Sequence, residues 1–181
     1  LRNVLSLYAA EGLRTVVAPE VEFYLVAKNL DPDYVLSPPK GRSGRKESSR
    51  LSYSIDAVAE FEDFVEDMYE YATAQELHVD TLIHENGAAQ MEINFLHGDA
   101  LSLADQVFTF KRTARETAHK HGMYATFMAK PMMAEPGSAM HIHQSVVDAR
   151  TGRNIFVDRK GRHSEAFLSY IAGLQRYTPE L

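Results

Sequence analysis

Glu20 and Glu22 lie two residues apart in the apolar, aromatic run Ala18–Leu25. The run is typical of a β-strand, in which neighbouring side chains point to opposite faces, so the two carboxylates share one face and Val21 and Phe23 share the other. Carboxylates a few ångströms apart repel one another unless a cation or a proton lies between them. The spacing therefore favours a hard divalent cation on this face, and the alternative is a solvated strand face without a ligand.

Two further segments supply groups of the same kind. Residues 84–95 contain Glu85 and Glu92, and residues 137–145 contain His141 and His143 on another alternating segment. Four carboxylates and an imidazole suit Mg²⁺ or Mn²⁺, and the imidazole shifts the preference toward Mn²⁺. Four acids exceed what one Mg²⁺ usually takes from a protein, so two metal ions are favoured over one. Paired ions of this kind indicate metal-dependent phosphoryl or acyl-phosphate chemistry.

Composition limits the class of protein. The chain has 181 residues, of which 45% are hydrophobic, and this is enough for one domain with a core. The net charge of -6 argues against nucleic acid as the main partner. The absence of cysteine excludes disulfides, thiolate metal sites and cysteine nucleophiles.

The chain shows no sign of a membrane or secretory destination. No apolar run approaches the roughly 20 residues of a membrane span, and no signal peptide is visible. We therefore expect a cytoplasmic protein without a membrane partner. The sequence opens on Leu1 rather than Met, which we interpret as a piece of a longer protein.

The elements that must position the acids and histidines follow from periodicity. Amphipathic patterns predict helices over residues 3–11, 55–77, 99–121 and 165–177, with Ser54 or Asp56 as the cap of the second and Ser164 as the cap of the last. Alternation predicts strands over 14–27, 124–129, 139–147 and 155–157, and a hairpin over 79–95 that turns at Asn86-Gly87. These elements predict an α+β fold with the helices on one face of a sheet.

A long polar segment, residues 29–54, separates the first strand from the second helix. Prolines and glycines interrupt it, and its second half is basic through Lys40, Arg42, Arg45, Lys46 and Arg50. A loop of this length is usually functional or disordered. Contact with a phosphate or a neighbouring subunit is one interpretation, and a solvated mobile loop is the other.

Four motifs together resemble a known family. They are PEVEF at 19–23, ENGAAQME at 85–92, KP at 130–131 and GSAMHIHQS at 137–145. In order and spacing they resemble the first half of the catalytic domain of glutamine synthetases. The segments AQMEINF and EPGSAMHIHQS are more similar to the γ-glutamyl-amine ligase branch, the γ-glutamylputrescine synthetase-like proteins, than to the ammonia-assimilating enzymes.

The resemblance implies a curved, mainly antiparallel sheet with long helices packed on one face. It also implies ATP-dependent ligation, in which the γ-carboxylate of glutamate attacks the γ-phosphate of ATP. Ammonia or a primary amine then displaces phosphate from γ-glutamyl phosphate. The family uses two or three divalent ions and forms ring-shaped homo-oligomers, so we expect a homo-oligomer for the full-length protein.

The resemblance also implies roles for individual positions. The ligands of the metal nearer to glutamate and the amine are matched by Glu22, Glu85 and Glu92. The ligands of the metal that holds the ATP phosphates are matched by Glu20 and His141. His143 matches a histidine close to the nucleotide phosphates, and Gly137 matches the backbone glycine that receives glutamate.

The chain departs from the family pattern in two ways. Classical members have Asn-Gly-Ser-Gly where this chain has residues 136–139, Pro-Gly-Ser-Ala, so Pro136 replaces an amide side chain and stiffens the loop. That change affects the contact to the substrate α-amino group and the strict use of free glutamate. We also expect that the family's N-terminal β-grasp domain and C-terminal half, with its arginines, are absent, and that residues 1–181 alone are inactive.

Two other classes of protein fit part of the pattern. The first is a non-catalytic metal-binding or nucleotide-binding scaffold derived from the same family. The second is a cupin-type metal barrel, suggested by His141, His143 and the downstream Asp148. Two long amphipathic helices and the glycine spacing argue against the barrel.

Overall fold

A computed structural model describes residues 1–31, 33–48 and 50–180. Positions 32 and 49 of the predicted loop lie outside the described residues. The chain divides into two compact units, of which the first holds residues 1–17, 98–101 and 143–181 and the second holds 18–97 and 102–142. All candidate site residues except His143 belong to the second unit.

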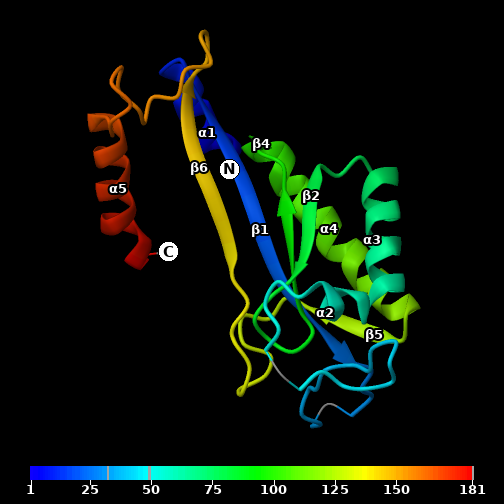
Figure 1. The fold of residues 1–181 in the computed structure, drawn as a ribbon. Helices are drawn as coiled ribbons and strands as arrows, with labels where there is room; N and C mark the ends of the chain where they lie inside the picture. The colour runs from blue at the N-terminus through cyan, green and yellow to red at the C-terminus, as the bar shows by residue number, and fades with distance from the viewer. Residues whose placement is uncertain (32, 49, 181) are drawn as a thin grey trace. The chain divides into compact units, whose positions relative to one another are not determined.

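The sheet is built around one long strand, β1 (Leu13–Ala27). The strand order is β2-β3-β1-β4, and β5 and β6 also pair with β1 (Figure 1). The pairing of β1 with β3, β4 and β5 and of β2 with β3 is antiparallel, so the predicted mainly antiparallel sheet is confirmed. The bounds are Val79–His84 for β2, Gln90–Phe95 for β3, Gly98–Asp99 for β4, Met123–Thr126 for β5 and Met140–Asp148 for β6.

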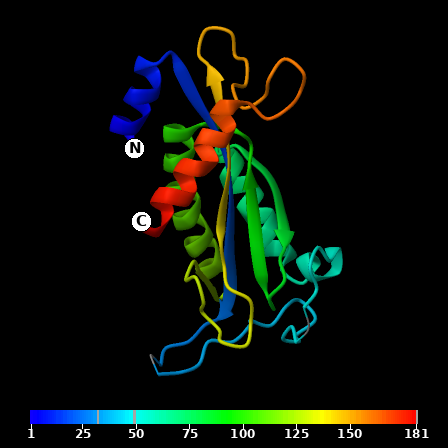
Figure 2. The same cartoon turned by 90° about the vertical axis from the view of Figure 1, so that its left-hand side faces the viewer.

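Helices α3 (Glu62–Ala74) and α4 (Ala100–Lys120) carry the aromatic side chains that cover one face of the sheet. Phe23 is fully buried, and its ring centroid lies 6.4 Å from that of Phe64 on α3 and 5.9 Å from that of Phe110 on α4. Such aromatic contacts add about 0.5–1.5 kcal/mol to the area that they bury. The two helices run on the same side of the sheet (Figure 2), as the α+β prediction requires.

The helix predicted over residues 55–77 is wrong in one respect, because the structure breaks it into α2 (Ile55–Ala59) and α3. The carboxylate of Glu60 accepts a hydrogen bond from the Ser43 backbone N–H (3.1 Å), and its carbonyl accepts one from the Arg42 N–H (2.9 Å). Phe61 leaves the helical path and is 5% exposed. The break is therefore fixed by the distant loop, while Ser54, one of the two predicted caps, is the residue that caps α2.

The predicted hairpin is confirmed as β2 and β3, but its turn works differently from an Asn-Gly turn. The residue with positive φ is Ala89 (φ 57), which is fully buried. Gly87 is needed for space, because a Cβ there would collide with the hydroxyl of Tyr24 on β1. The glycine thus lets β1 approach the turn closely.

The first unit carries α1 (Arg2–Ala10), α5 (Glu165–Tyr177) and the 3₁₀ turn Thr178–Glu180. The predicted cap is confirmed, since the Ser164 hydroxyl accepts a hydrogen bond from the Phe167 N–H (3.2 Å). The strand predicted over 155–157 is wrong, because only isolated bridges form there, such as Val157 with His163. Among the described residues, no helix is both long and apolar enough to cross a membrane.

Candidate metal and substrate site

The second face of the sheet, opposite the helices, carries the acids. In β1 and β3 the residues on this face are directly paired, as Glu20 with Asn94, Glu22 with Glu92 and Tyr24 with Gln90. The intervening residues Val21 and Phe23 are buried on the helix face, which confirms the predicted division of the strand. Antiparallel pairing places paired side chains about 5 Å apart, so the register concentrates negative charge in one place.

His141 completes a group that could hold a metal ion. One ligand atom from each of Glu20, Glu92 and His141 lies within 4.8 Å of the others. His141 Nδ1 lies 3.5 Å from Glu20 Oε2 and 3.8 Å from Glu22 Oε1. Two or three carboxylates with one imidazole form an oxygen-rich donor set that fits Mn²⁺ or Mg²⁺.

Burial makes the charge on Glu92 costly. The Glu92 side chain is largely buried, and this burial raises the pKa of its carboxyl group above the ordinary value. A hydrogen bond from Asn94 Nδ2 to Glu92 Oε1 (3.2 Å) opposes the rise in pKa, while nearby negative charges add to it. Those charges are on Glu20, Glu85 and Glu22. A divalent cation would offset the repulsion among these groups.

Glu22 and Glu85 are held differently from the group of three. Glu22 is 8% exposed, and its Oε2 accepts hydrogen bonds from the Ala139 N–H and from Gln90 Nε2, both at 3.0 Å. Glu85 lies in the turn after β2, where its Oε2 accepts a hydrogen bond from the Asn86 N–H (2.7 Å). The structure thus brings Glu20, Glu92 and His141 together, and the assignment of Glu22, Glu85 and Glu92 to one metal stays a prediction.

Gly137 lies in the loop that leads into β6. A Cβ at Gly137 would lie 2.9 Å from the carbonyl oxygen of Ala129, and the Ser138 N–H donates to that same oxygen (2.8 Å). The loop therefore packs closely against residue 129, with little room for a side chain. His143 is exposed on β6 and belongs to the first unit, so its nucleotide role stays a prediction.

Two polar side chains next to the hairpin turn, those of His84 and Glu47, were not identified from the sequence pattern. His84 is fully buried, with Nε2 2.9 Å from Glu47 Oε2 and Nδ1 2.7 Å from the Glu85 carbonyl oxygen. Glu47 Oε2 also accepts a hydrogen bond from the Ala89 N–H (2.5 Å). These contacts tie the basic loop to the turn of the hairpin. Glu47 is the single acid among the basic residues 40–50, and this was the signal in the sequence that could have pointed to the contact.

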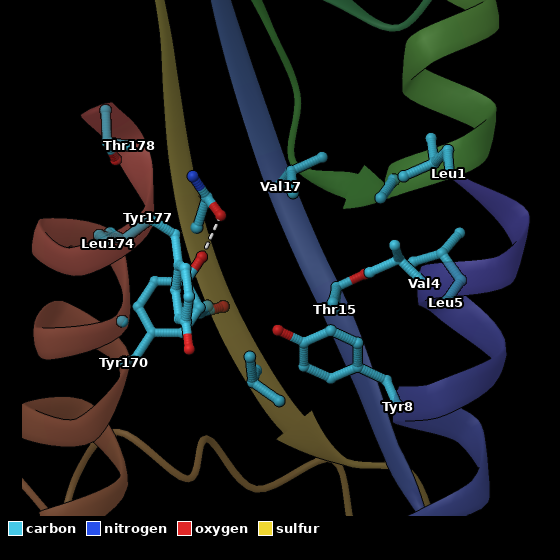
Figure 3. Close-up of a pocket in the computed structure, with 15 residues that line it drawn as sticks. Leu1, Val4, Leu5, Tyr8, Thr15, Val17, Tyr170, Leu174, Tyr177 and Thr178 are labelled. Carbon is cyan, nitrogen blue, oxygen red and sulfur yellow. Dashed lines mark hydrogen bonds between the residues drawn. The ribbon is translucent and has the colours of Figure 1, made fainter. Parts of the chain in front are cut away.

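The first unit contains a separate apolar cavity of about 470 Å³. Its walls come from α1, α5, β1 and β6, and the rings of Tyr8 and Tyr170 point into it (Figure 3). The Tyr170 hydroxyl donates a hydrogen bond to Gln144 Oε1. Burial raises the pKa of the Tyr170 hydroxyl, and the charge of Tyr8 adds to the rise. The lining lacks carboxylates and imidazoles, so this cavity offers no chemistry like that of the acid face.

Comparison of the sequence with known families gives a match along the whole chain. A family model described as "Glutamine synthetase, catalytic domain" matches residues 1–181. The γ-glutamylputrescine synthetase PuuA of Escherichia coli is 39% identical over 166 residues, which are 90% of this chain and 35% of that protein. The glutamine synthetase of Pyrococcus abyssi is 34% identical over 181 residues, or 100% of this chain and 38% of that protein.

Solved structures agree with this match. A structure titled "GmaS/ADP complex-Conformation 1" superposes with a TM-score of 0.80 at 26% identity, covering 98% of this chain and 39% of that one. A Plasmodium falciparum glutamine synthetase superposes with a TM-score of 0.77 at 18% identity, over 98% of this chain and 39% of that one, which supports the fold alone. The chain spans a little over a third of the length of the curated relatives named above.

Proposed function

The chain belongs to the glutamine synthetase family, and from this premise we propose that it forms the metal-binding part of an ATP-dependent ligase. The ligase joins the γ-carboxyl group of glutamate to ammonia or a primary amine. The observation that carries the proposal is the convergence of Glu20, Glu92 and His141 on the acid face of the sheet. That convergence arises from pairing between strands far apart in the sequence.

The donor set fits Mg²⁺ or Mn²⁺. When bound, a divalent ion would neutralise negative charge on phosphate groups. Glu20, Glu92 and His141 would hold such an ion, and Glu22 Oε1, which faces His141, would be a further ligand. Glu85, in the turn after β2, is the remaining proposed ligand, with two or more ions in a complete site.

We propose substrate-binding roles for two residues, Gly137 in the loop that leads into β6 and His143 on β6 itself. The backbone of Gly137 would receive glutamate, and His143 would contact the phosphates of ATP. In the reaction, an oxygen of the γ-carboxylate attacks the γ-phosphorus of ATP and ADP leaves. The amine nitrogen then attacks the carbonyl carbon of γ-glutamyl phosphate, and phosphate leaves with the amine losing a proton.

The class of amine is open between ammonia and larger primary amines, and one observation favours a larger one. The relative from Escherichia coli is named a γ-glutamylputrescine synthetase and is 39% identical. We therefore propose a primary amine such as a polyamine as the acceptor.

The protein that carries this chain would contain further parts. We propose that residues 1–181 are a portion of the catalytic domain, that the missing portion supplies arginines for the phosphates, and that the chain alone does not turn over. We also propose a cytoplasmic homo-oligomer that binds no nucleic acid. A steady rate of phosphate release by residues 1–181 alone would contradict the proposed inactivity.

The test is a calorimetric titration of Mn²⁺, with and without ADP, into the wild type and into a variant that combines Glu20→Ala with His141→Ala. We expect binding that tightens with ADP in the wild type and is lost in the variant. The matched control combines Glu66→Ala on α3 with the exposed His78→Ala, and it should bind as the wild type does.

The two negative outcomes differ in meaning. If Mn²⁺ binds equally to the wild type and to the Glu20→Ala, His141→Ala variant, the acid face is not the metal site. If the wild type binds no Mn²⁺ at millimolar concentration, the chain is a scaffold that does not hold metal by itself, and the proposed role of these residues is wrong for this chain.

A further inference from the structure

Gln90 is a glutamine in the interior of the molecule, on β3 and directly opposite Tyr24 on β1. It is 1% exposed, which is unusual for a primary amide because such groups are mostly found at the surface. A buried amide is costly unless its oxygen and both N–H groups have partners. The partners of Gln90 therefore indicate what the residue is for.

The oxygen of the Gln90 amide holds the turn of the hairpin. Its Oε1 accepts a hydrogen bond from the Gly87 backbone N–H at 2.8 Å. The Tyr24 hydroxyl also lies 3.2 Å from this oxygen, but its one proton has a shorter partner, the Pro136 carbonyl oxygen at 2.8 Å. Tyr24 and Gln90 together thus reach both the turn and the loop that precedes Gly137.

The nitrogen of the Gln90 amide joins an acid of the candidate site to that loop. Nε2 donates to Glu22 Oε2 and to the Gly137 carbonyl oxygen, both at 3.0 Å, and Ser138 Oγ lies farther away at 3.4 Å. Both N–H groups therefore have an acceptor. One acceptor is a proposed metal ligand, and the other is the proposed glutamate-binding residue.

These contacts fix which oxygen of Glu22 is available. Oε2 receives two hydrogen bonds, from Gln90 and from the Ala139 N–H, whereas Oε1 lies 3.8 Å from His141 Nδ1. A carboxylate with one oxygen held by two donors cannot rotate without losing both bonds. The amide of Gln90 thereby aims Glu22 Oε1 at the group formed by Glu20, Glu92 and His141.

We propose that Gln90 is a positioning residue that fixes Glu22 and the Gly137 loop in one arrangement, so that the metal ligands and the glutamate-binding backbone form a single site. The inference rests on the proposed function for the roles of Glu22 and Gly137. Groups that orient metal ligands from behind commonly change metal affinity by about 10–100-fold when they are removed.

The test compares two variants with a matched control. Gln90→Met keeps the length of the side chain and removes all three hydrogen-bonding groups. Gln90→Glu keeps an acceptor for the Gly87 N–H but presents an oxygen instead of N–H groups to Glu22 and Gly137. The control is Gln75→Met at the end of α3, where another glutamine makes side-chain hydrogen bonds to Tyr71 and Thr113.

Two measurements are made on each protein, the affinity for Mn²⁺ by calorimetry and the hydrogen exchange of single backbone amides. For Gln90→Met we expect a loss of Mn²⁺ affinity of about tenfold or more. We also expect exchange about tenfold faster at the Gly87 and Ala139 amides, with the central amides of β1 and β3 unchanged. For Gln90→Glu we expect the Ala139 amide to lose its protection from exchange, while the Gly87 amide stays protected. Gln75→Met should change neither quantity.

The outcomes separate positioning from packing. Uniformly faster exchange throughout β1 and β3, with unchanged Mn²⁺ affinity, would show that Gln90 only fills the core and would overturn the proposal. Unchanged exchange at Ala139 in both variants would overturn it as well. If the wild type binds no Mn²⁺, the metal role in the proposed function fails, whereas selective loss of protection at Ala139 still supports the positioning of Glu22 by Gln90.

Discussion

Glu22 on β1 and Glu92 on β3 are directly opposite one another in the antiparallel register. The two glutamates are 8% and 7% exposed, so solvent screens their charges poorly. Like charges directly opposite in a sheet destabilise it. The fold therefore carries an electrostatic cost on this face that a bound cation would remove, and the cost can be measured in the metal-free protein.

Replacing Glu92 by Gln should stabilise the metal-free protein. The substitution removes a buried charge that lies opposite Glu22 while keeping the shape of the side chain. We expect a gain of up to about 1 kcal/mol, or about 2–4 °C in Tm for a chain of this size. The same variant should lose the increase in Tm that Mn²⁺ gives the wild type, because it lacks one of the three convergent ligands.

Thermal unfolding in the presence of a chelator, and then of Mn²⁺, measures both effects of Glu92→Gln. The control is Glu66→Gln, at an exposed position of α3, which should leave Tm and its response to Mn²⁺ unchanged. A lower Tm for metal-free Glu92→Gln would contradict the interpretation of Glu92 as a destabilising buried charge.

Removing the imidazole of His141 should change the choice of metal. Mn²⁺ accepts imidazole nitrogen readily, whereas Mg²⁺ prefers oxygen ligands. In His141→Ala we expect the affinity for Mn²⁺ to fall about tenfold or more and that for Mg²⁺ to fall much less. The His141 side chain is 61% exposed, so the variant should keep the wild-type Tm without metal.

Competition between Mn²⁺ and Mg²⁺, followed by the paramagnetic signal of free Mn²⁺, measures that preference. His78→Ala removes an exposed imidazole that precedes β2 and serves as the control. Equal losses for the two metals in His141→Ala would argue that His141 acts through the fold and does not bind the ion.

Local patterns were sufficient for much of the fold and for the faces of the strands. Helix α5 has the bounds predicted for it, because Ser164 caps it and its apolar period is regular. The alternation around Glu20 and Glu22 correctly placed the two carboxylates on one face of the strand and Val21 and Phe23 on the other, although Glu22 is buried as well. In both cases the deciding interactions join residues that are close in sequence.

Where distant residues decide, the sequence pattern was insufficient. The helix break at Phe61 depends on contacts between Glu60 and the loop at Ser43. The amide of Gln90 gave no signal of its own, because its partners at Glu22 and Gly137 are 68 and 47 residues away. The register that brings Glu92 to Glu22 likewise follows from strand pairing, which periodicity does not specify.

Substituting Gly87 by Ala should destabilise the protein. The new Cβ would collide with the hydroxyl of Tyr24, whose side chain is fully buried and donates to the Pro136 carbonyl oxygen. Overpacking of this kind costs about 1–3 kcal/mol. We expect a lower Tm and a smaller loss when Gly87→Ala is combined with Tyr24→Phe, since the hydroxyl is then gone.

The control for Gly87→Ala is Gly173→Ala in α5. A Cβ there meets no atom within 4 Å among the described residues, and alanine favours a helix over glycine by about 0.5–1 kcal/mol. Chemical denaturation should therefore show opposite signs for the two glycine variants. If Gly87→Ala leaves the free energy of unfolding unchanged, Tyr24 can move away from the turn. The interpretation of a rigid contact between Gly87 and Tyr24 would then be wrong.

Asp67 on α3 should make part of the stability dependent on pH. Its Oδ2 accepts hydrogen bonds from Lys120 Nζ (2.8 Å) and lies 2.6 Å from His121 Nε2, so it links α3 to the end of α4. The hydrogen bond from Lys120, followed by that from His121, lowers the pKa of the Asp67 carboxyl group below its ordinary value of 3.8. A group whose pKa is lower in the folded protein stabilises the fold when it is ionised.

The stabilisation by Asp67 is therefore complete above the ordinary aspartate pKa of 3.8 and is lost as the pH falls through the lower folded value. Asp67→Asn should be less stable than the wild type at neutral pH, and the difference should shrink as the medium becomes acidic. Unfolding by urea across this range measures the difference, with Asp105→Asn on the exposed side of α4 as the control. A difference that stays constant with pH would show that Asp67 stabilises the helix pair by its shape and not by its charge.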